Sequence, residues 1–428
     1  MLESEFAGPV NILVVNAGSS SLKFNMFCMF EEKVLAKGIV ERIGLREPSL
    51  KYERFDGKKL VEQQKITNHD EALRVVCEKL VDPEYGVLKS LSQVEAIGHR
   101  VVHGGEKCHD SHKITPEIKD IIRECATLAP LHNPPNLGGI EACERVFTGV
   151  PNVAVFDTAF HHSMPPASYL YAIPYEYYEK YGIRKYGFHG TSHKFVAQAT
   201  ADFLGRHLED LKLITCHLGN GASITAINQG KSIDTSMGMT PLSGLVMGTR
   251  CGDIDPAVVL YLVHQGMAAD EVDKLLNKKS GLLGVAGIGS SDMRDVIDAA
   301  ECGNEQAKRA LWMFVHRLVS YIGSYHTILG GADAVVFTGG IGENSAYIRT
   351  RIIAKLSCLG CLLDETVNHD VVGRPAIVSM PESTLKAVVM PTNEELMIAR
   401  ETHRLLKETP KPAGAVVQQP ALNKPIGA

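Results

Sequence analysis

The feature that most constrains the fold is a pattern of strand, small-residue turn and strand that occurs twice in the chain. Residues 11–30 read as an apolar strand, NILVV, a turn, NAGSSS, and an alternating strand, LKFNMF. In the second strand Leu22, Phe24 and Met26 share one face. Residues 213–227, LITCHLGNGASITAI, repeat the same plan. The repetition predicts a duplicated α/β architecture.

A third strand also runs into small residues, and a fourth ends in a carboxylate. The segment 331–345, GADAVVFTGGIGENS, predicts an apolar strand followed by a Gly-rich turn. The segment 152–157, NVAVFD, predicts a short buried strand that ends at Asp157. Small residues after a strand let backbone N–H groups approach an anion, so these turns suit phosphate binding. The sequence contains no GxxxxGK[ST] and no GxGxxG opening a helix after the first strand, which excludes a P-loop and a dinucleotide fingerprint.

Length and charge narrow the class of protein further. A chain of 428 residues exceeds what one compact core needs, so two or three domains are expected. With 44 basic against 49 acidic residues the net charge is -5, which makes nucleic acid an improbable main partner. We expect no membrane segment, because no apolar run is long enough, and a cytoplasmic enzyme, because ten cysteines are too sparse for a disulfide scaffold.

The three turns and the segments between them carry a family resemblance. NAGSSSLKF, HLGNGASI and FTGGIGEN resemble the phosphate-1, phosphate-2 and adenosine motifs of the actin-like ATPase superfamily. GHRVVHGGE, PLHNPPN, VFDTAFH, YGFHGTSH, MGTRCGDIDP and PTNEEL resemble the acetate and propionate kinase family, from about residue 10 to 405. The resemblance implies a duplicated two-lobed actin-like ATPase (ribonuclease H-like) fold with the active site in the cleft between the lobes. It also implies reversible phosphoryl transfer between ATP and acetate, giving ADP and acetyl phosphate, by direct in-line transfer.

The resemblance and the composition together predict the organisation of the chain. The N-terminal lobe is expected over 1–155, with a last helix near 394–408 packing back on it, and the nucleotide-binding C-terminal lobe over 156–393. The Pro-rich tail 409–428 has no periodicity and is expected to be disordered. The helical segment 305–327 offers a surface for a homodimer.

An enzyme that phosphorylates a carboxylate has to neutralise the negative charge of the acceptor and of the phosphates, and it does not have to supply a base. Acetate is already ionised at neutral pH, and the transferred group must be stabilised as charge develops on it. Arg100 in GHRVVHGG and Arg250 in MGTRCGD lie beside glycines that would let each guanidinium reach into a cleft. A lone arginine is usually a surface charge. The resemblance implies that Arg100 and Arg250 flank the acetyl and phosphoryl groups.

Three further side chains have implied catalytic or supporting roles. The resemblance makes His189 the donor to the transferred phosphoryl group and places His132 near the substrate. Asp157 corresponds to the family's catalytic aspartate. Because acetate has no proton to remove, we interpret Asp157 as orienting an arginine or hydrated magnesium rather than acting as a base.

Mg²⁺, with Mn²⁺ as an alternative, needs one or two hard oxygen ligands beside phosphate oxygens and waters. The resemblance implies that Asn16 and one glutamate of PTNEEL are associated with the metal. Thr392 and Glu395 have the spacing of a capping box, which would give Glu395 a structural task. Glu394 is therefore the predicted metal ligand.

The remaining predicted site residues contact ATP or the acetyl methyl group. For ATP the resemblance implies Lys23, His217, Leu218, Gly219, Asn220, Gly221, Asp292, Met293, Arg294, Gly340, Ile341, Gly342, Glu343 and Asn344. For the acyl pocket it implies Val102, Leu131, Phe188 and Pro241, beside Arg100 and His132.

Two other functions compete with acetate kinase at this point. Propionate kinase has nearly the same motifs. An actin-like or chaperone-like ATPase would share the nucleotide motifs, but it gives no reason for the two arginine loops.

Overall fold

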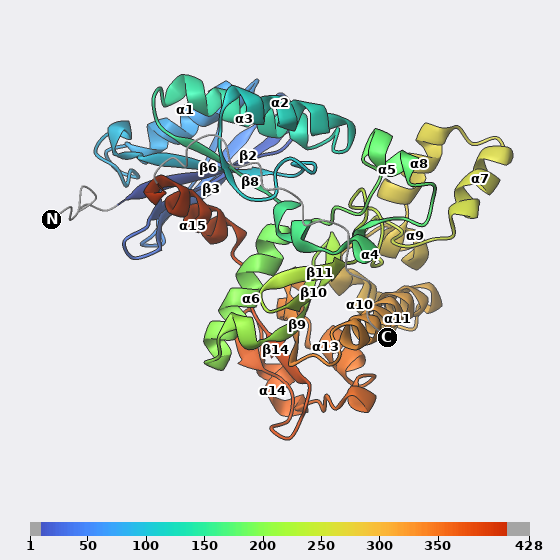
Figure 1. Cartoon of the computed structure of the whole chain (residues 1–428). Helices are drawn as coiled ribbons and strands as arrows, with labels where there is room; N and C mark the ends of the chain where they lie inside the picture. The colour runs from blue at the N-terminus through green and yellow to red at the C-terminus, as the bar shows by residue number, and fades with distance from the viewer. Residues whose placement is uncertain (1–9, 409–428) are drawn as a thin grey trace.

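The computed structural model describes residues 10–408, so the predicted disordered tail lies outside the described residues. Two sheets organise the described chain (Figure 1). The strands of the first sheet are β1 (Asn11–Ala17), β2 (Ser21–Cys28), β3 (Lys33–Glu41), β4 (Ser49–Arg54), β5 (Lys59–Gln63), β6 (Ala96–Val101), β7 (His112–Lys113) and β8 (Asn152–Phe156). Those of the second are β9 (Lys212–Leu218), β10 (Ala222–Asn228), β11 (Lys231–Thr235), β12 (Ala334–Thr338), β13 (Ala376–Ile377) and β14 (Lys386–Val389).

The two sheets repeat one topology, which confirms the predicted duplication. In the first sheet β3, β2 and β1 pair antiparallel, and β6 and β8 then add in parallel to β1. In the second sheet β11, β10 and β9 pair antiparallel, and β12 and β14 add in parallel to β9. Each sheet therefore has a set of parallel strands whose carboxyl ends share one edge, where ligands bind in open α/β sheets.

Helices cover both faces of each sheet. The helices are α1 (His69–Leu80), α2 (Pro116–Glu124), α3 (Asn133–Val146), α4 (Pro166–Tyr169), α5 (Glu176–Tyr181), α6 (Gly190–Leu204), α7 (Pro256–His264), α8 (Ala269–Lys278), α9 (Gly281–Ala286), α10 (Met293–Glu301), α11 (Glu305–Ile328), α12 (Gly339–Asn344), α13 (Ala346–Ile353), α14 (Glu365–Asp370) and α15 (Glu394–Lys407). Short 3₁₀ turns span Leu91–Gln93, Cys125–Thr127, Ala159–Ser163, Leu208–Asp210 and Ser357–Leu359. No helix in the described range 10–408 is long and apolar enough to cross a membrane.

The first sheet lies between α1 and α3 on one face and α15 on the other (Figure 1). Leu13 and Val15 of β1 pack with α1 and α3, whereas Ile12 and Val14 pack with Ile398 of α15. The alternation follows from the two-residue period of a strand. The last helix of the chain thus completes the core that the first strands begin.

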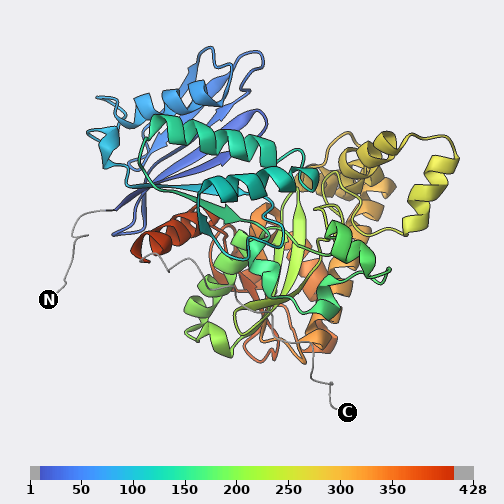
Figure 2. The same cartoon turned by 45° about the horizontal axis from the view of Figure 1, so that its top comes forward.

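The second sheet is built in the same three layers. Ile214 of β9 and Val335 of β12 pack into the core with α9, α10, α11 and α13, while Leu213 and Val336 pack against α6 on the opposite face. The connection from β8 to α6 leads into this half, and α15 leads back (Figure 2). The lobe boundary near residue 155 stays a prediction.

Several local predictions can be compared with these elements. The helical periodicity of residues 69–80 predicts a helix, which is α1, and Thr115 followed by Pro116 has the pattern of an N-cap with Pro at the first helical position, which is how α2 begins. The expected turn after β12 is different: Gly339–Asn344 forms the single-turn helix α12. The carboxylate of Glu343 accepts from Gly339 N–H at 2.8 Å, which holds the chain in helical form from its first residue.

Candidate active site

The ends of three parallel strands bring predicted site residues to one edge of the first sheet. Asn16 lies near the end of β1, Arg100 near the end of β6, and Asp157 directly after β8. The register pairs Val15 with His99 and Arg100 with Val155, so these ends are neighbours. Sequence segments more than a hundred residues apart therefore meet at one position.

Arg100 and Asp157 form a buried bidentate ion pair. Arg100 donates from Nε to Asp157 Oδ1 at 3.2 Å and from Nη2 to Oδ2 at 2.6 Å. The Asp157 side chain is 1% exposed and that of Arg100 is 25% exposed. The charge of Asp157 raises the pKa of Arg100, more than burial lowers it. The two-bond geometry fixes the guanidinium plane, as expected for an aspartate that orients an arginine.

Two buried asparagines of α3 hold the loops around this pair. Asn136 accepts from Val102 N–H at 3.1 Å and donates to the Ala17 carbonyl at 2.8 Å, which ties the ends of β1 and β6 together. Asn133 accepts from His103 N–H at 3.1 Å. Both asparagines lie in PLHNPPN, one of the segments that carry the family resemblance, but neither was predicted as a site residue. An Asn pair spaced three residues apart at a helix start was the signal that could have found them.

Arg250 has no acidic partner among residues 10–408. Its Nη1 donates to the Pro241 carbonyl at 3.1 Å and lies 3.8 Å from Met247 Sδ. Burial lowers the pKa of Arg250. A Cβ at Gly221 would lie 3.6 Å from Arg250 Nη1 and 3.5 Å from His189 Nε2. Arg250 and His189 thus converge on the Gly221 turn, and the guanidinium is available to an anion.

His189 is held in a strained position at the start of α6. It is the N-cap residue, with φ 55° and ψ 22°, a left-handed conformation that is uncommon for a residue other than glycine. Its ring stacks on His217 with centroids 4.3 Å apart, and its Nδ1 lies 2.9 Å from Ser223 Oγ. Burial, followed by repulsion from His217, His193 and the two arginines, lowers the pKa of His189 well below its ordinary value. The ring is therefore neutral at neutral pH.

His132 and the residues predicted for the acyl pocket differ in how deeply they are buried. His132 precedes α3, and its pKa is lowered by burial and by the charges of Arg100 and Arg250. Val102 and Phe188 are 4% and 2% exposed and belong to one hydrophobic cluster. Leu131, in contrast, is 63% exposed. Pro241 contributes the carbonyl that binds Arg250.

The predicted capping box at the start of α15 is wrong. The helix begins one residue later than that box requires, and Asn393 is the N-cap, accepting from Leu396 N–H at 3.0 Å. Thr392 instead bonds through its Oγ to Ser192 Oγ at 2.8 Å. With the cap at Asn393, the third helical residue is Leu396, which has no side chain able to reach back.

The two glutamates that follow have different partners. Glu395 forms an ion pair with Lys23. Glu394 lies 4.0 Å from Arg100 Nε, and its pKa is raised to about 7, chiefly by burial and also by the charges of Asp157 and Glu395. Glu394 thus faces the Arg100–Asp157 pair, whereas Glu395 and Lys23 line a separate cavity against β2–β5.

A cavity of ≈ 650 Å³ lies at the corresponding edge of the second sheet. The predicted nucleotide residues that line it are Gly219, Asn220, Asp292, Met293, Arg294, Gly340, Ile341 and Asn344. Residues that the sequence analysis missed also line it, namely Ser290, Ser291, Ile297 and Ser345. The run GIGSSDMR, with small residues directly before a helix, was the signal for the two central serines.

Other predicted nucleotide residues do not line this cavity. These are Lys23, His217, Leu218, Gly221, Gly342 and Glu343. Glu343 accepts from the N–H of Gly339 at 2.8 Å and from that of Thr392 at 3.1 Å, so its carboxylate is engaged by backbone donors. His217 stacks on His189 instead.

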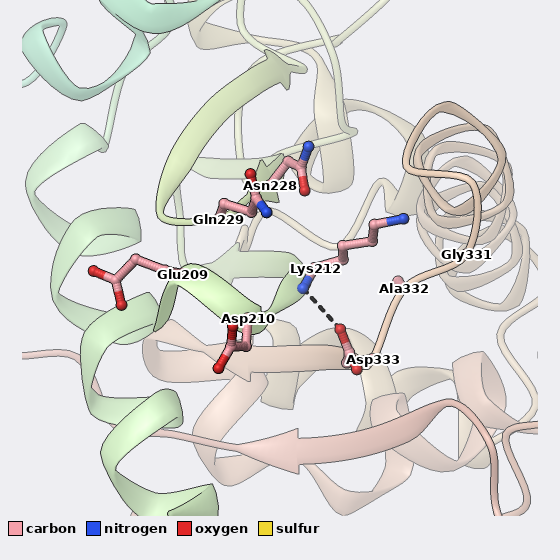
Figure 3. Close-up of a pocket in the computed structure, with 8 residues that line it drawn as sticks. All are labelled: Glu209, Asp210, Lys212, Asn228, Gln229, Gly331, Ala332 and Asp333. Atoms are coloured by element: carbon pink, nitrogen blue, oxygen red, sulfur yellow. Dashed lines mark hydrogen bonds between the residues drawn. The ribbon is translucent and has the colours of Figure 1, made fainter. Parts of the chain in front are cut away.

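A further cavity, of ≈ 480 Å³, lies at the opposite end of the second sheet (Figure 3). It is lined by Lys212 at the start of β9, Asn228 at the end of β10 and Asp333 just before β12. Asp333 accepts from the Lys212 N–H at 2.8 Å, the bond drawn in Figure 3. None of the predicted site residues lines this cavity, so it is not part of the candidate site.

Comparisons with known proteins show which family the chain belongs to. The model of the acetokinase family matches residues 11–400. The acetate kinase of Methanosarcina mazei is 53% identical over 397 residues, 92% of this chain and 97% of that protein. The solved acetate kinase of Porphyromonas gingivalis is 45% identical with a TM-score of 0.89, over 93% of this chain and 100% of that one. The solved propionate kinase of Francisella tularensis is 43% identical with a TM-score of 0.86, over 92% of this chain and 99% of that one. The chain therefore belongs to the acetokinase family.

Proposed function

We propose that this enzyme transfers a phosphoryl group reversibly between ATP and acetate, giving ADP and acetyl phosphate by direct in-line transfer. The observation that carries the proposal is that Arg250 and His189 approach the same Gly221 turn and that the charges of Arg100 and Arg250 both act on His189, because these donors suit an anionic acceptor and a phosphoryl group. The relatives named acetate kinase, at 53% identity, support the same activity.

The roles proposed for the two arginines follow from their different partners. Arg250 has no acidic partner in the described chain, and we assign it to the charge on the transferred phosphoryl group and on acetate. Arg100 is fixed by Asp157 and supplies a rigid guanidinium edge to the carboxylate. Asp157 then acts by orientation, and no general base is needed because acetate is already ionised.

His189 donates to the transferred phosphoryl group in the transition state, with His132 in a supporting role. A neutral imidazole can donate from one nitrogen only, and Nε2 is the nitrogen that faces the Gly221 turn. The acyl pocket is assigned to Val102, Phe188, Pro241 and Leu131, of which Val102 and Phe188 are buried.

The nucleotide is assigned to the 650 Å³ cavity, whose small residues and helix starts suit phosphates and a ribose. Gly219 and Asn220 follow β9, and Gly340 follows β12. β9 and β12 are parallel neighbours, which is why the segments that follow them lie on one edge of the sheet. His217, Leu218, Gly221, Gly342 and Glu343 are proposed to act around this cavity rather than in its wall. Lys23 lines the separate cavity against β2–β5, and its proposed place near the ATP phosphates rests on the resemblance.

A divalent cation is part of the proposal, with Mg²⁺ as the metal and Mn²⁺ as an alternative. Residues 10–408 contain no group of three or more acidic, His or Cys side chains placed to hold a metal ion. An amide oxygen of Asn16 and the Glu394 carboxylate fit Mg²⁺, because that ion takes one or two protein oxygens and keeps phosphate oxygens and waters. The metal would neutralise phosphate charge, and its presence would favour the ionised form of Glu394.

We also propose that the enzyme is a homodimer. Helix α7 has no buried residue, although its sequence is PAVVLYLVH, and Figure 1 places it at the outer edge of the second half. Leu260 and Tyr261 of α7 are 61% and 64% exposed, and Trp312 of α11 is 65% exposed. Exposed apolar side chains of this kind are typical of an interface. Replacing Leu260 and Tyr261 with aspartate should give monomers by light scattering, and unchanged dimers would contradict the assignment.

The proposal includes a cytoplasmic site of action, supported by free thiols at all ten cysteines.

The decisive experiment measures turnover with acetate, with propionate and with no acceptor, in the presence of ATP and Mg²⁺. If the enzyme is an acetate kinase, we expect the highest kcat/KM with acetate and little ATP hydrolysis without an acceptor. A preference for propionate would favour the alternative represented by the Francisella tularensis relative. Acceptor-independent hydrolysis would refute both.

A further inference from the structure

We propose that Ser223, His193 and Thr215 are positioning residues that hold His189 in the tautomer whose Nε2 carries the proton. The inference deepens the proposed function and rests on it, because it concerns the donor that faces the phosphoryl group. The tautomer of His189 can be measured by spectroscopy without substrate, so it can be tested separately from the proposed activity.

The four side chains form one continuous chain of hydrogen bonds. Ser223 Oγ lies 2.9 Å from His189 Nδ1 and 2.7 Å from His193 Nε2. At the far end, His193 Nδ1 lies 2.7 Å from Thr215 Oγ. His189 and His193 are one helical turn apart on α6, while Thr215 and Ser223 come from β9 and β10.

Burial forces this chain to satisfy its own polar atoms. Ser223, His193 and Thr215 are each 0% exposed. Burial also lowers the pKa of His193 well below its ordinary value, as it does for His189. Both rings are therefore neutral, and each has one N–H donor and one acceptor nitrogen.

Two proton arrangements satisfy all three hydrogen bonds and also use the Ser223 proton. A third, in which Ser223 accepts from both rings, leaves that buried proton without an acceptor in the described chain and is costly for that reason. In the first, Thr215 donates to His193 Nδ1, His193 Nε2–H donates to Ser223, and Ser223 donates to His189 Nδ1. In the second, every donor and acceptor is reversed, and His189 carries its proton on Nδ1. The first arrangement leaves His189 with a protonated Nε2, and the second leaves Nε2 without a proton.

The Thr215 hydroxyl decides between the two arrangements. In the first its proton is used in the bond to His193. In the second Thr215 accepts from His193, and its own proton needs another acceptor, but within the described range Thr215 Oγ has no other hydrogen-bond partner. A buried donor left without a partner is costly, so the first arrangement is favoured.

The favoured tautomer aims a donor at the candidate site. His189 Nε2 and Arg250 Nη1 both approach the position of a Cβ at Gly221, at 3.5 and 3.6 Å. A proton on Nε2 gives the phosphoryl oxygens a second donor beside the guanidinium. A proton on Nδ1 would instead direct the Nε2 lone pair at an anion, which is repulsive.

The test reads the tautomer of His189 by nitrogen NMR of the full chain labelled with ¹⁵N-histidine. His189 signals are assigned by their loss in His189→Gln. We expect an unprotonated Nδ1 and a protonated Nε2 in the wild type. A proton found on Nδ1 would overturn the inference, whatever the kinetics show.

Ser223→Ala removes the link between the two rings. We expect a mixture of His189 tautomers and about a tenfold fall in kcat, with the KM values for ATP and acetate within about twofold, because the donor acts on the transferred group. Ser223→Thr keeps a hydroxyl and should restore the tautomer and most of the kcat. An unchanged tautomer and kcat in Ser223→Ala would refute the positioning role.

Thr200→Val is the matched control. Thr200 lies on α6, is 0% exposed, and its Oγ has no hydrogen-bond partner among residues 10–408, so the change removes a buried hydroxyl outside the chain of bonds. In Thr200→Val the His189 tautomer and the kcat should equal those of the wild type. If Thr200→Val matched Ser223→Ala, the effect would come from packing alone and the inference would fail. A wild type with protonated Nε2 but no acetate turnover would refute the proposed function and support the tautomer.

Discussion

Arg250 and Arg100 should lose similar activity but very different stability when each is replaced by alanine. The reason lies in their partners. Arg250 donates to one backbone carbonyl and has no acid beside it in the described chain. Burying its charge is therefore unfavourable, and replacing Arg250 removes that cost of desolvation. Arg100 is bonded twice to Asp157, which is 1% exposed, so removing it leaves a buried carboxylate without its partner.

The expected magnitudes follow from these contacts. Loss of a transition-state donor lowers turnover by about a hundred- to a thousandfold, or about 2.7–4 kcal/mol, in either variant. Breaking a buried ion pair costs about 3–5 kcal/mol, so Arg100→Ala should be clearly destabilised. Arg250→Ala loses one hydrogen bond, worth about 0.5–1.5 kcal/mol, and gains from the removed charge. The two variants should therefore differ in stability by roughly 3 kcal/mol.

Steady-state kinetics and thermal unfolding of the two variants, measured side by side, test this reasoning. Arg250→Lys should remain impaired, because an ammonium group lacks the planar fork, and added guanidinium should restore part of the activity of Arg250→Ala. Near-normal kcat in Arg250→Ala would refute its role. Equal loss of stability in both variants would refute the argument from unequal partners.

Three further predictions concern the acyl pocket and the metal site. Val102→Ala should shift the ratio of kcat/KM from acetate towards propionate by roughly ten- to two-hundredfold, since one methylene is worth about 1–3 kcal/mol; an unchanged ratio would remove Val102 from the pocket. Glu394→Gln should raise the Mg²⁺ concentration needed for half-maximal rate, whereas Glu395→Gln, which loses the pair with Lys23, should raise it less; the reverse order would make Glu395 the ligand. The pKa of Glu394 is raised from 4.5 to about 7, chiefly by burial, so the folded state retains a proton there that the unfolded state has released. Without metal, the melting temperature should therefore fall as pH rises from about 4.5 through 7, and Glu394→Gln should reduce that slope.

Local patterns were enough to predict the framework of the fold. The two hairpins, α1 and the Thr115 cap of α2 depend on residues adjacent in sequence, so they could be identified from spacing alone. Asp157 was predicted at the carboxyl end of a strand, whereas Arg100 was predicted only to lie beside glycines; the parallel pairing of β6 with β8 brings the two together. Their roles came from family resemblance and remain proposals.

Contacts between distant segments were beyond such patterns. Thr392 had the sequence of a helix cap, yet its hydroxyl bonds to Ser192, two hundred residues earlier, and the helix starts one residue later. Glu343 lay in a turn that suits phosphates, but the backbone of Thr392 and Gly339 engages its carboxylate. The chain from His189 to Thr215 depends on the register of β9 and β10, which one sequence does not specify.

The position of α15 has a consequence for synthesis on the ribosome. The strands of the first sheet are complete at Phe156, but the helix that covers one of its faces ends only at Lys407. At the usual rates of about 5–20 residues per second, that face stays uncovered for roughly 10 to 50 s. The second sheet, whose final strand ends at Val389, receives its last strand before the first sheet receives its cover. The half of the enzyme that is translated first is therefore the half that finishes folding last, and its exposed apolar strands are the surface a nascent-chain chaperone would meet.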